Sequence, residues 1–159
     1  MLSICREFLS IRRQRVVVDG ATSELIPIVS GMPQGSVLGS LPFFLYTSEM
    51  FELVENRLYA YSDDSTLLAV VRKPGDRPAV SASLNRDLAR IQEWCNHRCM
   101  ILNPYKTRAL VVSRSGTVNP PHGDLVFSGV SICAGPNLDI LLVKFDRRLT
   151  FNQIYYLFI

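Results

Sequence analysis

The chain has 159 residues, of which 48% are hydrophobic and 19% charged, a balance typical of one globular domain of ordinary size. Its net charge of +3 is too small to indicate a nucleic-acid partner by itself. No run approaches the ~18 apolar residues of a membrane span, and charges interrupt the amino end before a secretory signal could form. We therefore expect an intracellular protein, in the cytoplasm or nucleus, that is not secreted and has no membrane partner.

The amino-terminal part of the chain predicts a short helix and then a hairpin. Residues 1–13 carry apolar side chains at roughly helical spacing and end in two arginines. Residues 14–18 and 25–29 are rich in β-branched side chains and flank Asp19-Gly20. Asp-Gly between such runs favours a β-hairpin.

A glycine-rich loop at residues 31–35 precedes the next predicted helix. Ser36 is suited to cap the start of this helix, which we expect to continue to Phe51. Pro42 would then lie in the helix interior, where proline costs about 3 kcal/mol. We therefore expect a kink in this helix.

Residues 57–71 form two apolar, β-favouring runs that meet at Asp63-Asp64, a pattern typical of a β-hairpin. Adjacent carboxylates repel each other, and a bound cation offsets that repulsion. Mg²⁺ is often held through one or two carboxylates together with substrate phosphates. The tip is therefore a candidate half of a metal site, although an Asp-Asp-Ser turn is also typical of exposed hairpin ends at which both acids face water.

Residues 80–99 predict an amphipathic helix. Its apolar stripe consists of Leu84, Leu88, Ile91 and Trp94 or Cys95. An aromatic residue in such a stripe is expected in the core rather than on the surface as a platform for base stacking. After it we expect a strand at 109–112 and a hairpin of 125–127 with 130–132.

Four cysteines show no paired Cys-x-x-Cys spacing, so we expect reduced thiols. Cys95, His97 and Cys99 offer three zinc-type ligands close together in sequence. On a helix, however, positions 95 and 99 share a face that position 97 does not, and no fourth ligand is evident.

Three motifs follow one another along the chain. They are Pro33-Gln34-Gly35-Ser36, an aromatic-x-Asp-Asp run at 61–64, and Leu-Asn-x-x-Lys-Thr at 102–107. Their order and spacing resemble the palm of non-LTR (LINE-type) retrotransposon reverse transcriptases, from about residue 8 to about residue 151. The resemblance implies an α/β (α+β) polymerase palm, incomplete here, with an antiparallel sheet and helices packed on one face. It predicts a partial reverse transcriptase domain over 1–151 and a non-homologous apolar tail over 152–159.

The resemblance also implies RNA-directed DNA synthesis, in which a nucleotidyltransferase extends a primer 3′-OH with dNTPs on an RNA template. The implied cofactor is Mg²⁺ or Mn²⁺, held by Asp63 and Asp64 in two-metal catalysis. Lys106 would lie near the triphosphate and neutralise charge or act as a general acid.

Further contacts follow from the same resemblance. Substrate and template contacts fall to Gln34, Gly35, Ser36 and Tyr61, and the primer grip to Leu142, Val143 and Lys144. Relatives carry Gly where this chain has Leu142, a change that could block close approach of the primer. Arg12, Arg13 and Arg15 fit either template phosphate or an ordinary solvated basic face.

The family's first metal-binding Asp has no counterpart in this chain, and Asp19 lies in the wrong stretch for that role. We expect a palm that lacks its first catalytic strand, most of the fingers and the thumb, and that is inactive alone. The alternatives are a non-catalytic nucleic-acid-binding remnant and an unstable product of a decayed retroelement copy.

Overall fold

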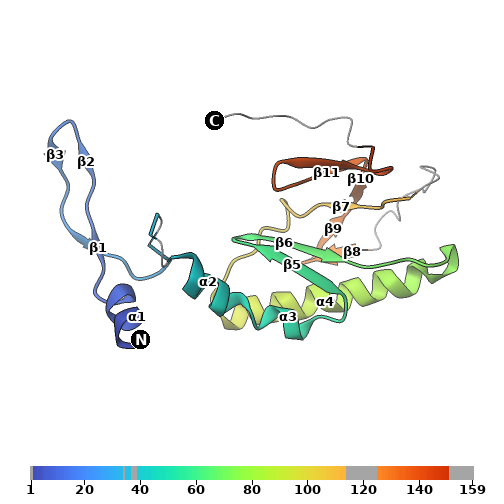
Figure 1. Cartoon of the computed structure of the whole chain (residues 1–159), viewed down its shortest axis with the longest axis horizontal. Coiled ribbons are helices and arrows are strands. Elements are labelled where there is room, and N and C mark those ends of the chain that lie inside the picture. Colours follow the sequence, from blue (N-terminus) through green and yellow to red (C-terminus); the bar gives the residue numbers. More distant parts are fainter. Residues whose placement is uncertain (1, 34, 37–38, 114–124, 151–159) are drawn as a thin grey trace. The chain divides into compact units, whose positions relative to one another are not determined.

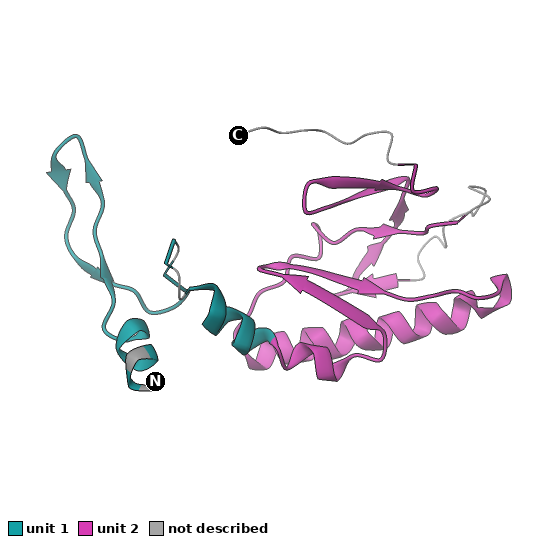
Figure 2. Ribbon diagram, in the orientation of Figure 1, with its two compact units in different colours: residues 1–47 teal, residues 48–159 magenta. Residues whose placement is uncertain are grey.

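The computed structural model describes residues 2–33, 35–36, 39–113 and 125–150 (Figure 1). It consists of two compact units, residues 1–47 and residues 48–159, which are described in turn (Figure 2). Within the described ranges, no helix is long and apolar enough to cross a membrane.

The described part of the first unit contains two helices and a bulged hairpin. Its elements are α1 (Leu2–Leu9), β1 (Arg13–Gln14), β2 (Val17–Val18), β3 (Ala21–Thr22), β4 (Ile26–Pro27) and α2 (Ser40–Thr47). Strand β1 pairs with β4 and β2 with β3, both antiparallel. Asp19 and Gly20 form the turn with φ of 50° and 82°, as a type I′ turn requires, so the hairpin predicted from Asp-Gly is confirmed. The register shifts by one residue between the two strand pairs, which makes a bulge.

The helix expected to start at Ser36 starts at Ser40 instead. The Ser36 hydroxyl donates to the Pro33 carbonyl, 3.1 Å away, and closes a loop rather than capping a helix. Pro42 therefore lies in the first turn, where its missing N–H costs no helical hydrogen bond, and the expected kink has no cause. The helix also ends at Thr47, before the predicted Phe51.

Among the described residues, the second unit contains three hairpins, two further short strands and one long helix. Its elements are α3 (Met50–Leu53), β5 (Arg57–Tyr61), β6 (Asp64–Leu68), a 3₁₀ turn η1 (Pro74–Asp76), α4 (Arg77–His97), β7 (Ala109–Leu110), β8 (Leu125–Phe127), β9 (Val130–Ile132), β10 (Ala134–Gly135), β11 (Asn137–Ile140) and β12 (Val143–Asp146). The hairpin predicted at 125–132 is confirmed, with its turn at Ser128-Gly129. Helix α4 is longer than predicted at its start, because Pro78 is well suited to the first helical turn.

The strands pair only in twos among the described residues. Five pairs are antiparallel, whereas β7 and β10 are parallel. The fold class is thus mixed helix and strand with small sheets, and among the described residues the strands do not join into the larger antiparallel sheet that was expected. Short strands of two to five residues explain the difference, since they offer few ladder hydrogen bonds for a third strand.

The core of the second unit gathers on α4. Met50, Ile91, Trp94 and Cys95 form a buried cluster, and half-buried side chains of α3, β5 and the segment after α4 pack against it. The predicted core position of Trp94 is confirmed, with 8% of the residue exposed. Leu84 and Leu88 are half-buried and lie on the part of the stripe that faces the later strands.

Candidate active site

The β5–β6 hairpin carries the two adjacent carboxylates. Its five paired positions run from Arg57 opposite Leu68 to Tyr61 opposite Asp64. The turn is Ser62-Asp63, one residue earlier than the predicted bend, so Asp64 belongs to strand β6. Ser62 has a φ of 53°, and positive φ at the first loop position alone is the type II′ pattern.

Residues opposite each other in an antiparallel pair share a face, so the register divides the hairpin into two faces. Tyr59, Tyr61 and Asp64 lie on one face and are exposed. Leu58 lies on the other face and packs against the core cluster on α4. The hairpin therefore presents Tyr61 and Asp64 together on its open face, next to Asp63 in the turn.

Asp63 and Asp64 are both exposed and offer hard oxygen ligands of the kind Mg²⁺ prefers. Within the described ranges, no group of three or more His, Cys, Asp or Glu residues could hold a metal ion. Two carboxylates are a number through which Mg²⁺ is often held when substrate phosphates and water complete its coordination.

Lys106 lies in a compact turn after α4. The side chain of Asn103 accepts hydrogen bonds from the backbone N–H groups of Tyr105 and Lys106, at 3.0 and 3.3 Å, and the Thr107 hydroxyl donates to the Asn103 carbonyl. Asn is well suited to this role because its side chain mimics a backbone turn. Lys106 is exposed, and across the described residues no ion pair joins it to Asp63 or Asp64.

The loop predicted to contact substrate belongs to the first unit. Gln34 lies outside the described residues. Gly35 is exposed and has a φ of 74°, which favours glycine. Gly39 is buried, and a Cβ there would lie 2.7 Å from the Pro33 carbonyl oxygen, so the closed loop needs glycine at this position.

The predicted primer-grip residues lie on the β11–β12 hairpin. Leu141 and Leu142 form its turn, with φ of 48° and 67°. Val143 pairs with Ile140, and Lys144 lies opposite Asp139. The turn was not predicted, because Leu-Leu carries none of the Gly, Asn or Asp signals of a type I′ turn.

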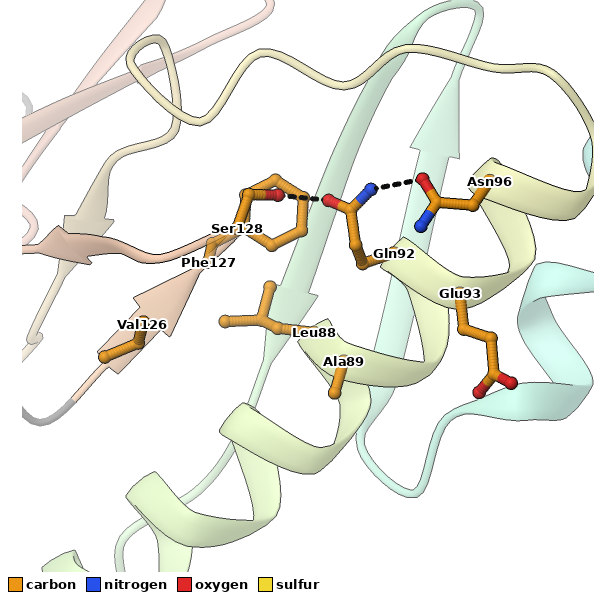
Figure 3. A pocket seen from close by; sticks show the side chains of 8 residues that line it. All are labelled: Leu88, Ala89, Gln92, Glu93, Asn96, Val126, Phe127 and Ser128. Atoms are coloured by element: carbon orange, nitrogen blue, oxygen red, sulfur yellow. Dashed lines mark hydrogen bonds between the residues drawn. The ribbon is translucent and has the colours of Figure 1, made fainter.

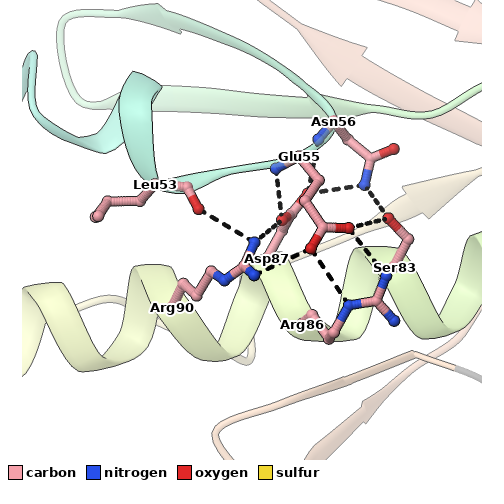
Figure 4. Close-up of polar contacts among 7 residues, drawn as sticks. All are labelled: Leu53, Glu55, Asn56, Ser83, Arg86, Asp87 and Arg90. Atoms are coloured by element: carbon pink, nitrogen blue, oxygen red, sulfur yellow. Dashed lines mark hydrogen bonds and ion pairs between the residues drawn. The ribbon is translucent and has the colours of Figure 1, made fainter.

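A polar network missed in the sequence joins α4 to the start of β5 (Figure 4). Asp87 is fully buried, and its carboxylate accepts from the backbone N–H groups of Glu55 and Asn56, at 2.8 and 3.0 Å. The Asn56 amide donates to the same carboxylate at 2.7 Å, and Arg90 lies 3.5 Å from it. A signal existed in the sequence, because Asp87 interrupts the apolar stripe of α4 at a core position.

Glu55 covers this network from the solvent side. Its carboxylate pairs with Arg86 at 2.9 Å and with Arg90 at 3.0 Å. The hydrogen bond from Arg86 is the largest cause that lowers the pKa of Glu55, to about 2, and Arg90 adds to it.

A second contact ties the end of α4 to the segment before α3. The Trp94 indole N–H donates to Glu49 at 3.1 Å, and Arg98 pairs with the same carboxylate. The hydrogen bond from Trp94 is the largest cause that lowers the pKa of Glu49, followed by that from Arg98. The indole is therefore bound within the protein and is not presented for stacking.

An open pocket of about 340 Å³ lies between α4 and the β8–β9 hairpin (Figure 3). The Ser128 hydroxyl bonds to the Gln92 side chain, whose amide donates to Asn96 at 2.9 Å. Phe127 and Leu88 supply apolar walls. The pocket contains none of the site residues predicted from the sequence.

The motifs on the β5–β6 hairpin and after α4 occur in a chain that belongs to the reverse transcriptase (RNA-dependent DNA polymerase) family, which matches residues 1–153. The chain is 30% identical over 158 residues to the RNA-directed DNA polymerase from mobile element jockey of Drosophila melanogaster. It is 26% identical over 157 residues to the probable RNA-directed DNA polymerase from transposon BS of the same organism. The resemblance to non-LTR retrotransposon reverse transcriptases is thereby confirmed.

Each match covers 94% of this chain but 17% of the relative. The chain thus spans about a sixth of the length of these curated relatives. No solved structure matches it.

Proposed function

We propose that this chain carries the Asp-Asp carboxylates for RNA-directed DNA synthesis of the non-LTR retrotransposon type. The observation that supports this most directly is the placement of Asp63 and Asp64 at the exposed tip of a hairpin. The family match over residues 1–153 connects that tip to nucleotidyl transfer.

In this proposal Asp63 and Asp64 hold Mg²⁺ or Mn²⁺, which when bound stabilises the attacking and leaving oxygens of an in-line displacement. Tyr61, on the same face as Asp64, packs near the primer end. Lys106 neutralises the triphosphate or protonates the departing pyrophosphate.

The remaining predicted residues bind and orient the nucleic acid and the dNTP. The loop of Gln34, Gly35 and Ser36 contacts the templating base and the incoming nucleotide. Residues 142–144 grip the primer strand. The proposal places this work inside the cell, where templates and dNTPs occur, and assigns it to residues 1–151, with 152–159 as a tail that lies outside the described residues.

We further propose that the 159-residue chain does not catalyse DNA synthesis by itself. The family uses a metal-binding Asp on a strand that precedes the loop of Gln34 and Gly35. In this chain, the Asp before that loop is Asp19. Asp19 lies in the turn between β2 and β3 of the first unit and not on a strand. Since the two carboxylates at the tip would remain, metal binding is expected without turnover.

Metal binding tests this proposal directly. We expect Mn²⁺ to bind the chain, as measured by electron paramagnetic resonance, and Asp63→Asn or Asp64→Asn to weaken binding by about tenfold or more, since each removes a charged ligand. Asp19→Asn is the matched control, because it neutralises another exposed hairpin-turn acid. Equal Mn²⁺ affinity in Asp63→Asn and Asp19→Asn would contradict the assignment of the site.

The second candidate function is that of a non-catalytic nucleic-acid-binding remnant. A primer-extension assay distinguishes it from a working polymerase. The exposed Arg13 and Arg15 on and beside β1 favour phosphate contact. Salt-sensitive RNA binding without extension would support this candidate. Mg²⁺-dependent extension that Asp63→Asn abolishes would show instead that the chain is a working polymerase.

A further inference from the structure

In the described part of the chain, the β5–β6 hairpin is attached to α4 through an apolar contact and a polar one. Its strands pair with each other and with no other strand among the described residues. Leu58 packs on the core cluster from one face, while the opposite face is exposed. The other attachment is at the root of the hairpin, where Glu55 and Asn56 precede β5.

Asp87 supplies that attachment. Its two carboxylate oxygens accept both backbone N–H groups of the root and the side-chain amide of Asn56, at 2.7 to 3.0 Å (Figure 4). A fully buried carboxylate is unfavourable unless its charge and lone pairs are satisfied. Here the root provides three of its donors, and no buried polar side-chain atom lacks a partner in the described part of the chain. The contact is therefore directional, unlike the apolar contact of Leu58.

A small rotation of the hairpin at its root displaces the turn at its tip by a larger distance. A strand rises about 3.4 Å per residue, so the turn lies roughly 20 Å from Asn56, and a rotation of about 5° at the root moves it by about 2 Å. A misplacement of about 1 Å can lower an enzymatic rate about a hundredfold.

We propose that Asp87 is a positioning residue, which sets the orientation of the β5–β6 hairpin on α4 and thereby places Asp63 and Asp64. Its catalytic meaning rests on the function proposed above. The orientation itself is a property of the 159-residue chain and is measured without activity.

Residual dipolar couplings test the proposal, because they report how the N–H vectors of two elements are oriented relative to each other. In the unmodified chain one alignment tensor should fit the couplings of both α4 and the hairpin. In Asp87→Asn the hairpin couplings should shrink or need a different tensor, while those of α4 stay the same. A single tensor that fits both elements in Asp87→Asn overturns the proposal.

Three further variants separate positioning from a merely structural role. Glu55→Gln removes the covering ion pairs and leaves Asp87 its donors, so one tensor should still fit. The double variant Asn56→Asp/Asp87→Asn reverses donor and acceptor between the two side chains but leaves one backbone N–H of the root facing an amide N–H, so partial restoration of the common orientation supports the proposal. Where Asp87→Asn does not fold, Asp87→Ser removes the carboxylate that accepts from the root, and unchanged hairpin couplings in it overturn the proposal.

Measuring Mn²⁺ binding in the same samples tests the proposed function separately from the positioning role of Asp87. If the unmodified chain binds no Mn²⁺, the proposed function fails, while the couplings still decide the role of Asp87. If Mn²⁺ binds at the tip and the couplings of Asp87→Asn match those of the unmodified chain, the positioning role fails and the proposed function stands.

Discussion

Leu141 and Leu142 form a turn that normally requires residues tolerant of the left-handed region. That region costs an ordinary L-residue about 1–2 kcal/mol. Two other turns in the described part of the chain have the same φ pattern, Asp19-Gly20 and Ser128-Gly129, and both place glycine at the second position. Leu142 is also 83% exposed, so it gains little from packing in return.

We expect Leu142→Gly to raise the free energy of unfolding by about 0.5–1 kcal/mol, since relief of the left-handed strain exceeds the entropic cost of glycine. Urea denaturation measures this change. The reverse substitution at the matched turn, Gly129→Leu, should lower stability. A destabilised Leu142→Gly would show that Leu142 makes contacts that outweigh its backbone strain.

Helix α4 is held to the segments before it by charged side chains. Glu55 pairs with two arginines of the helix, and Glu49 with Trp94 and Arg98. These carboxylates have lowered pKa values in the folded protein. A carboxylate with a lowered pKa stabilises the fold above its unfolded pKa, and that contribution is lost as the pH falls toward the folded pKa.

For Glu55 the loss should extend from about pH 4.5 down to about pH 2. We expect Glu55→Gln to be less stable than the unmodified chain at neutral pH, and the difference to disappear across this interval. The melting temperature as a function of pH measures it. Glu93→Gln is the control, because Glu93 is an exposed acid of α4 outside these ion pairs. A pH-independent difference would mean that the ion pairs of Glu55 do not contribute to stability.

The second unit as a whole protects one thiol. Cys95 is fully buried in the core cluster, and burial raises the pKa of its thiol, whereas Cys99 and Cys133 are exposed. Cys99 lies beyond the last residue of α4 with a φ of 54°, where the chain leaves the helix. Cys95 and Cys99, the two thiols considered as zinc ligands, thus differ in burial, since one is buried and the other exposed.

We expect Cys99 and Cys133 to react rapidly with a thiol reagent at neutral pH, and Cys95 to react only as the core opens, because the thiolate is the reactive form and must be reached. Mass spectrometry after timed labelling measures each rate. In concentrated urea the three rates should converge. Equal rates for Cys95 and Cys99 in the native protein would mean that the core is not closed.

Exposed apolar side chains distinguish the first unit. Val16, Val17 and Val18 are each 60% or more exposed, and Ile26 is 51% exposed. Among the described residues, the strands of this hairpin pair only with each other, and each of these four side chains is more than half exposed. The β-branched runs of this stretch therefore predicted the strands but gave no information on their burial.

The sequence by itself determined the family, the carboxylate hairpin, the core helix and the turns at Asp19-Gly20 and Ser128-Gly129. These features depend on neighbouring residues, through helical spacing, β-branched runs and the backbone freedom of glycine. Only the tertiary structure decided that Asp87 binds the root of the hairpin, since its partners lie 31 and 32 residues away. The later start of α2 is instead a local effect that the sequence patterns missed, because the hydrogen bond between Ser36 and Pro33 joins residues three positions apart and closes the preceding loop. Local patterns specify which elements form, whereas contacts between distant residues specify how an element is held.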